Sequence, residues 1–129
     1  MIAASGLRAQ SGRMRVISEN IANANSTGKT PGSEPYQRRV PMFESAFDRE
    51  LNAYKIKLGR VSLDKSDFVR KHMPDHPAAN EEGYVLMPNV NPLVEMMDMR
   101  EAQRSYEANL NVIRSSRSMS LRTLDILRA

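Results

Sequence analysis

Apolar residues recur at helical spacing in the first part of the chain. Leu7, Met14 and Ile21 lie seven residues apart, and Ile17 belongs to a second series at coiled-coil spacing. Three asparagines between positions 20 and 25 are typical of a helix end. The pattern predicts an amphipathic helix within residues 1–25, and an isolated helix of this length is marginal in water. It therefore needs a partner.

The last part of the chain shows the same pattern over a longer stretch. Asn91 followed by Pro92 is typical of a helix start, with Asn91 as the N-cap and Pro92 in the first turn. A helix from there to residue 129 spans on the order of 50 Å, longer than the core of such a chain requires. Arg117 and Ser120 interrupt its two heptad series, which are Met99, Tyr106, Ile113 and Leu127 in one position and Met96, Leu110 and Leu124 in the other.

The middle of the chain is richer in turns and in alternating patterns. All seven prolines lie between positions 31 and 92, and no glycine follows position 83. Ile56 and Leu58 alternate with lysines, but the apolar positions then resume at Val61 and Leu63, one residue out of step. This slip predicts a β-hairpin with a bulge at Gly59.

Other elements are expected on both sides of this hairpin. A turn at residues 64–67 should lead into a return strand that begins at residues 68–69, and residues 84–87 should form a further strand. Ahead of the hairpin, four residues follow helical spacing: Phe43, Phe47, Leu51 and Tyr54. They predict a short helix.

These elements together predict a mainly α fold. The long N- and C-terminal helices pack as a coiled-coil-like pair, and a small β-hairpin is inserted between them. Residues 1–25 and 92–129 would form one discontinuous helical domain that builds a polymer, and residues 26–91 a loop with a small β-rich insert. The helices could simply close on each other as a hairpin, or they could also pack against neighbouring subunits. The interrupted heptads and the surplus length favour the second interpretation.

Composition and charge narrow the class of protein. The net charge of +4 is spread along the chain and largely matched by acids, whereas a nucleic-acid-binding protein usually shows a basic stripe. A basic coiled-coil nucleic-acid-binding protein is therefore the weaker alternative. The chain has no cysteine, which excludes a disulfide framework and thiolate metal ligands. We expect no membrane insertion, because no apolar run approaches the length of a membrane span, and no cleaved signal peptide.

Motifs for chemistry are weak. Gly28-Lys29-Thr30 matches the tail of a nucleotide-binding P-loop, but the required upstream glycine is Asn23, and Pro31 prevents the helix that must follow. His72 and His76 have the spacing of metal ligands on a helix, yet the prolines in and after this segment predict a turn. We therefore expect no enzyme, no metal and no cofactor.

Particular sequence motifs indicate the class of protein more specifically than the helical periodicity does. The segment Ile17-Ser18-Glu19-Asn20-Ile21-Ala22-Asn23-Ala24-Asn25-Ser26-Thr27-Gly28 resembles the N-terminal signature of the flagellar rod and hook proteins. Near the other end, Gly83-Tyr84-Val85, Pro88-Asn89-Val90-Asn91, Glu95-Met96 and Arg104-Ser105-Tyr106-Glu107-Ala108-Asn109 resemble the proximal-rod members of that family. The small middle insert agrees, since hook and distal-rod relatives carry larger ones.

The resemblance implies a structural subunit of the bacterial flagellar basal body. Such a subunit would be exported through the flagellar type III apparatus without signal cleavage and polymerise in the periplasm into the rod that transmits torque. Implied partners are further copies of itself, the other rod proteins and the protein that joins the rod to the MS ring. We expect the assembly contacts at Leu7, Met14, Ile17, Ile21, Asn23, Met96, Met99, Tyr106, Leu110, Ile113, Leu124 and Leu127.

Overall fold

Along the chain, a long helix comes first, six short strands follow, and a second long helix comes last. The computed structural model describes residues 2–128, so Met1 and Ala129, the outermost residues of the predicted helices, lie outside the described part. The elements are α1 Ile2–Ala22, β1 Arg39–Val40, β2 Phe43–Asp48, β3 Ala53–Leu58, β4 Ser62–Leu63, β5 Val69–His72, β6 Tyr84–Met87 and α2 Pro92–Arg128. This architecture confirms the predicted fold class.

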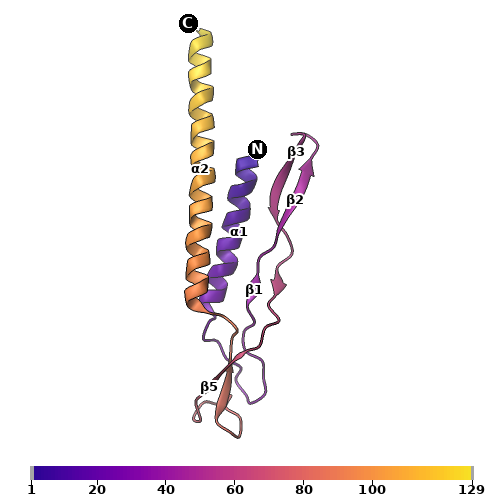
Figure 1. The fold of residues 1–129 in the computed structure, drawn as a ribbon, viewed down its shortest axis with the longest axis vertical. Helices are drawn as coiled ribbons and strands as arrows, with labels where there is room; N and C mark the ends of the chain where they lie inside the picture. The colour runs from indigo at the N-terminus through magenta and orange to yellow at the C-terminus, as the bar shows by residue number, and fades with distance from the viewer. Residues whose placement is uncertain (1, 129) are drawn as a thin grey trace.

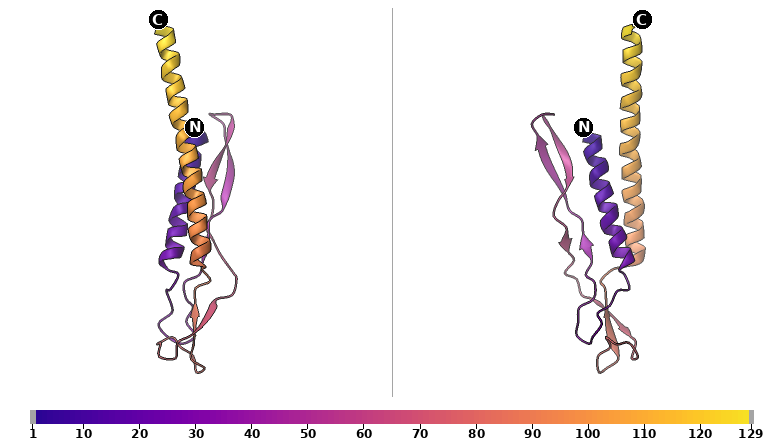
Figure 2. Two further views of the ribbon diagram at one scale, coloured as in Figure 1. Left: turned by 60° about the vertical axis from the view of Figure 1, so that its left-hand side comes forward. Right: turned by 180° about the vertical axis from the view of Figure 1, so that it is seen from behind.

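The helices run antiparallel, with α1 between α2 and the β2–β3 hairpin (Figures 1 and 2). The strands pair antiparallel as three two-stranded sheets, β1 with β4, β2 with β3 and β5 with β6. The β5–β6 hairpin lies at the end of the molecule opposite the C-terminus of α2. No helix among residues 2–128 is both long and apolar enough to cross a lipid bilayer.

Local side chains set the ends of both helices. The Asn91 side-chain oxygen accepts a hydrogen bond from the Leu93 N–H at 3.1 Å, and α2 begins at Pro92. At the end of α1, the Asn23 side-chain amide donates to the Glu19 carbonyl at 2.9 Å. Both predicted helix boundaries are thereby confirmed.

Two glycines allow α1 to approach both of its neighbours closely. A Cβ atom at Gly6 would lie 2.9 Å from Oδ1 of Asn109 on α2, and one at Gly12 would lie 2.6 Å from Cδ2 of Leu58 on β3. Each glycine lowers helix stability by roughly 1 kcal/mol relative to alanine. This cost is accepted because a glycine leaves room for the neighbouring element, and the two glycines do so on two different faces of the helix.

The predicted short helix over Phe43 to Tyr54 is wrong, because these residues form the β2–β3 hairpin. Asp48 accepts hydrogen bonds from the backbone N–H groups of Glu50 and Leu51, and Asn52 adopts a left-handed conformation with φ of 49°. Aspartate and asparagine favour such turns. The turn chemistry thus prevails over the helical spacing of the four apolar residues.

The predicted one-residue slip is present beyond this hairpin. Val40 pairs with Ser62 and Phe43 pairs with Leu58, so three residues, 59–61, face two residues, 41–42. The strand 84–87 is also confirmed as β6. The expected return strand at residues 68–69 exists as β5, but it pairs with β6 and not with the first hairpin, so that part of the predicted topology is wrong.

A buried polar cluster joins the two helices to the β segments where α1 ends and α2 begins. Glu95 in the first turns of α2 is only 1% exposed, and its carboxylate accepts hydrogen bonds from the Arg38 guanidinium and from the Asn20 side-chain amide at 3.4 Å. Asn20, itself fully buried, also accepts from the Tyr36 hydroxyl at 2.7 Å and from the Arg39 N–H at 3.0 Å. We call Asn20, Arg38 and Glu95 the polar node.

Arg38 extends this node to the β segments. Its guanidinium also lies 3.3 Å from Asp64 and 3.8 Å from Asp98, while its backbone N–H donates to the Asn89 side chain at 2.8 Å. Burial lowers the pKa of Arg38, but the hydrogen bond and charge of Glu95, with those of Asp64, outweigh it and raise that pKa overall. The cation is therefore held firmly in place by carboxylates from the segment after β4 and from α2.

Removing the Arg38 charge should destabilise the fold strongly. In Arg38→Met, the Glu95 carboxylate stays buried without its cation, which costs about 3–5 kcal/mol of unfolding free energy. Arg39→Met is the matched control, because Arg39 and Glu19 form an exposed pair at 3.0 Å that contributes at most about 1 kcal/mol. Urea unfolding followed by circular dichroism measures both. Equal effects of the two substitutions would contradict the proposed role of the node, as would a failure of Glu95→Met to recover stability in Arg38→Met.

Acid should weaken the same region through Asp64. Hydrogen bonds from the backbone N–H and hydroxyl of Ser66, and then Arg38, lower the pKa of Asp64 below its ordinary value of 3.8. A lowered folded-state pKa adds stability above the unfolded pKa, and that stability is lost as the pH falls through the folded value. We therefore expect Asp64→Asn to be less stable than the wild type at pH 6, with the difference shrinking between about pH 5 and pH 2. Asp67→Asn, at an exposed position three residues on, should follow the wild-type curve throughout.

Candidate assembly surface

The face of α2 that meets α1 is made of one predicted heptad series and several small or polar residues. Met99, Tyr106 and Ile113 are half-buried along this face. Between them lie Ala102, fully buried, and Asn109, which contacts Gly6. The small side chains let the two helices approach each other closely.

The other predicted positions divide between the interior and the surface. On α1, Ile17 is buried, whereas Leu7, Met14 and Ile21 are half-buried, as is Asn23 just after the helix. On α2, Leu110 is half-buried, and three predicted positions are exposed: Met96 and Leu124 of the second series and Leu127 of the first. In place of Met96, the series that meets α1 is Glu95, Ala102 and Asn109, which also lie seven residues apart.

The last four turns of α2 have no partner within the described chain. Contacts of Asn20 with Glu95 and of Gly6 with Asn109 fix the antiparallel register, so Ile2, the first residue of α1, lies opposite the region of Ile113. We call residues 114–128 the distal segment, and it projects beyond α1 in both views of Figure 2. Every residue from Arg117 to Arg128 is exposed. Five of them are large and apolar, between 51% and 76% exposed: Met119, Leu121, Leu124, Ile126 and Leu127.

A further apolar row on α2 was missed by the sequence reasoning. Val112, Met119 and Ile126 lie seven residues apart, so they share one face of the helix, and all three are exposed. Their spacing is the signal that could have revealed them. The distal segment thus offers apolar side chains on two faces, which is unusual for a helix that has to remain in water.

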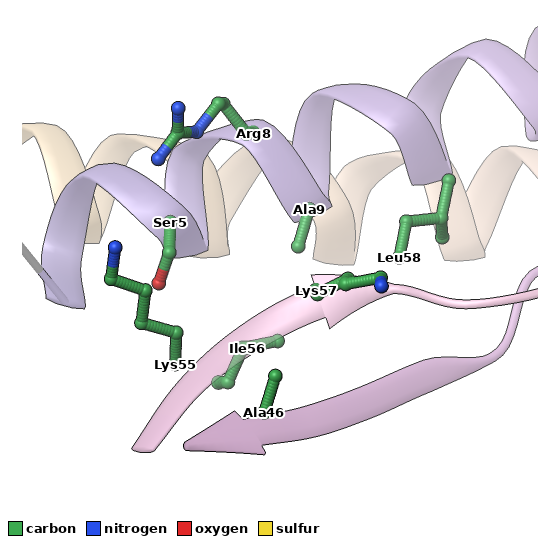
Figure 3. A pocket seen from close by; sticks show the side chains of 8 residues that line it. All are labelled: Ser5, Arg8, Ala9, Ala46, Lys55, Ile56, Lys57 and Leu58. Atoms are coloured by element: carbon green, nitrogen blue, oxygen red, sulfur yellow. The ribbon is translucent and has the colours of Figure 1, made fainter. Parts of the chain in front are cut away.

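A shallow groove runs between α1 and the β2–β3 hairpin (Figure 3). Its volume is about 350 Å³, and its lining is mostly apolar, with Ala9 on one side and Ala46, Ile56 and Leu58 on the other. The edge of the hairpin beside it leaves Phe47 and Tyr54 half-exposed or more, with their rings in edge contact at 5.1 Å. The hairpin therefore adds exposed aromatic side chains beside the groove.

The residues of the weak metal-site and P-loop motifs form hydrogen bonds that stabilise turns. His76 accepts the Ala78 N–H at Nδ1, so its Nε2 carries the proton and donates to the Thr27 hydroxyl at 3.2 Å. The segment that includes Lys29 follows a helix and forms a turn in which the Ser33 hydroxyl donates to the Thr30 carbonyl. Among residues 2–128 no group of three His, Asp or Glu side chains is arranged to hold a metal ion.

Comparison with known proteins matches the two helices to two families of flagellar basal-body rod proteins. Residues 1–28 match a family described as flagella basal body rod protein, and residues 81–126 match the C-terminal family of the flagellar basal body rod FlgEFG proteins. The matched segments contain α1 and most of α2, which are the elements joined by the polar node.

Individual relatives cover nearly the whole chain. The flagellar basal-body rod protein FlgC of Agrobacterium fabrum is 52% identical over 99% of this chain and 92% of that protein. FlgC of Bacillus subtilis is 37% identical over 97% of this chain and 93% of its own length, and FlgC of Salmonella typhimurium is 36% identical over 97% and 92%. These matches confirm the rod-protein hypothesis over the nucleotide-binding and nucleic-acid-binding alternatives. The chain belongs to the FlgC family of flagellar basal-body rod proteins, and it is a structural subunit and not an enzyme.

Proposed function

We propose that the chain polymerises through its helix pair into the proximal part of the flagellar rod, where it transmits torque from the membrane ring toward the hook and filament. The observation that carries this proposal is the row of exposed apolar residues on the distal segment. Full burial of one such side chain contributes about 1.5–3 kcal/mol. Contacts with neighbouring subunits provide that burial, and helices packed along the axis of a tube make a stiff shaft.

The same proposal includes where the subunit acts and what it meets. It leaves the cytoplasm through the flagellar type III export apparatus without signal cleavage and assembles in the periplasm. Its neighbours are other rod proteins and the protein that joins the rod to the MS ring. The segments near Asn89 and Tyr106 support this, because they resemble the proximal-rod members of the family, and the N-terminal signature around Asn20 resembles that of the rod and hook proteins.

The assembly interface is proposed to combine the exposed and half-buried predicted positions with the row at Val112, Met119 and Ile126. Ile17 contributes differently, since it is only 2% exposed inside the subunit. An aspartate there would bury a charge within the monomer and test folding, whereas an aspartate on the distal segment tests assembly. The discontinuous helical domain would thus provide the polymer contacts, and the β-rich insert would support it from one side.

Leu124→Asp should abolish rod formation while leaving the monomer folded. Leu124 is 51% exposed, so the substitution places a charge in water in the free subunit but in an apolar contact in the rod. Motility and isolated basal bodies are measured in cells that express the variant at normal level, and its export is checked in the periplasmic fraction. Ser118→Asp is the matched control, because Ser118 is exposed on the same segment but lies between the apolar rows. Complete rods carrying Leu124→Asp would contradict the proposal.

A further inference from the structure

Methionine thioethers are the only sulfur groups in this chain. The sequence has nine methionines and no cysteine. Four of those within residues 2–128 are exposed: Met42 at 51%, Met96 at 52%, Met97 at 64% and Met119 at 66%. The others within this range are half-buried. An oxidant in the surrounding solution should therefore reach the four exposed thioethers first.

The four exposed thioethers differ in their place on the molecule. Met119 is the middle residue of the exposed apolar row on α2, and Met96 occupies a predicted heptad position near the start of that helix. Both belong to the proposed assembly interface. Met97 points about 100° away from Met96 around the helix, and Met42 lies in the segment between β1 and β2. A pair inside the proposed interface is thus as exposed as a pair outside it.

A two-electron oxidant converts an apolar thioether into a polar sulfoxide. With hydrogen peroxide, one oxygen atom forms a bond to the methionine sulfur while the O–O bond breaks. The sulfur is oxidised, and the peroxide is reduced and leaves as water. The new S=O group accepts hydrogen bonds, so water satisfies it on the surface of a free subunit, whereas burial in an apolar contact without a donor is unfavourable. Loss of one buried apolar side chain from a contact lowers its binding constant by about tenfold or more.

We infer that Met96 and Met119 are modification sites: their oxidation to the sulfoxide by peroxides or other two-electron oxidants keeps a free subunit out of the rod. Methionine sulfoxide reductases reverse this modification at the expense of a thiol reductant, which returns the sulfur to the thioether and releases the oxygen as water. An oxidised subunit is therefore held back and can be repaired. The inference rests on the proposed function and adds to it a chemical regulation of the assembly surface.

A short pulse of hydrogen peroxide, ended with catalase, tests the modification in cells that are assembling rods. Mass spectrometry then measures the sulfoxide at each methionine in the free periplasmic subunit and in the chain from basal bodies completed after the pulse. Sulfoxide at Met96 and Met119 should be about tenfold less abundant in basal bodies than in the free subunit. Sulfoxide at Met42 and Met97 should be equally abundant in both, because these residues lie outside the proposed interface.

Met97 and Met119 form an internal control, since they are 64% and 66% exposed on the same helix. Three results would overturn the inference. These are a free subunit without sulfoxide at Met96 and Met119, equal sulfoxide at these two residues in the free subunit and in basal bodies, and equal depletion at all four exposed methionines.

Glutamine substitutions test the same site without an oxidant, because glutamine is polar and uncharged like the sulfoxide. Met96→Gln with Met119→Gln, expressed beside the wild-type chain, should be about tenfold less abundant in basal bodies than in the free subunit pool. Met42→Gln with Met97→Gln is the matched control and should enter basal bodies in proportion to its share of that pool. Equal entry of the two variants would reject the modification site alone, whereas a wild-type chain absent from isolated basal bodies would reject the proposed function.

Discussion

The structure depends on one buried ionic interaction, the Glu95 carboxylate held between Arg38 and Asn20. A carboxylate that is 1% exposed is tolerated only when a cation and hydrogen-bond donors satisfy it. Here the cation comes from the segment ahead of β1 and the amide from the last turn of α1. Three segments far apart in the sequence are therefore fixed at one point, and this fixes the antiparallel register of the helices without a large hydrophobic core.

The polar node fixes the two helices to each other at one end only, and the distal segment of α2 at the other end has no partner within the described chain. Away from the polar node, α1 and α2 meet through small or polar residues such as Gly6, Ala102 and Asn109, and the larger side chains on this face of α2 are only half-buried. The large apolar residues of α2 are instead displayed on the distal segment. In this rod subunit the two kinds of surface are thus separated: the contacts that fix the fold are polar and local, and the large apolar side chains of the distal segment stay exposed, which agrees with the proposed assembly.

Sequence reasoning found the features that local chemistry determines. Asn91 and Pro92 mark the start of α2, and the slip of apolar positions around Gly59 marks the irregular pairing. It failed for the features that are determined by contacts between distant parts of the chain or by the chemistry of a turn. The spacing of Phe43 and Phe47 gave no sign of the Asp48 turn, and heptad counting placed Met96 where the structure buries a charged Glu95. A glutamate in a helix seam becomes intelligible only once Arg38, 57 residues away, is seen beside it.

Amide hydrogen exchange of α2, compared between the free subunit and assembled rods, tests the central claim most directly. The account predicts that amides of residues 95–113 are protected already in the free subunit, because the polar node and α1 hold this part of the helix. Amides of the distal segment, residues 114–128, should exchange rapidly in the free subunit and become protected only in the rod. Strong protection of the distal segment in the free subunit, or its continued rapid exchange in the rod, would contradict the account.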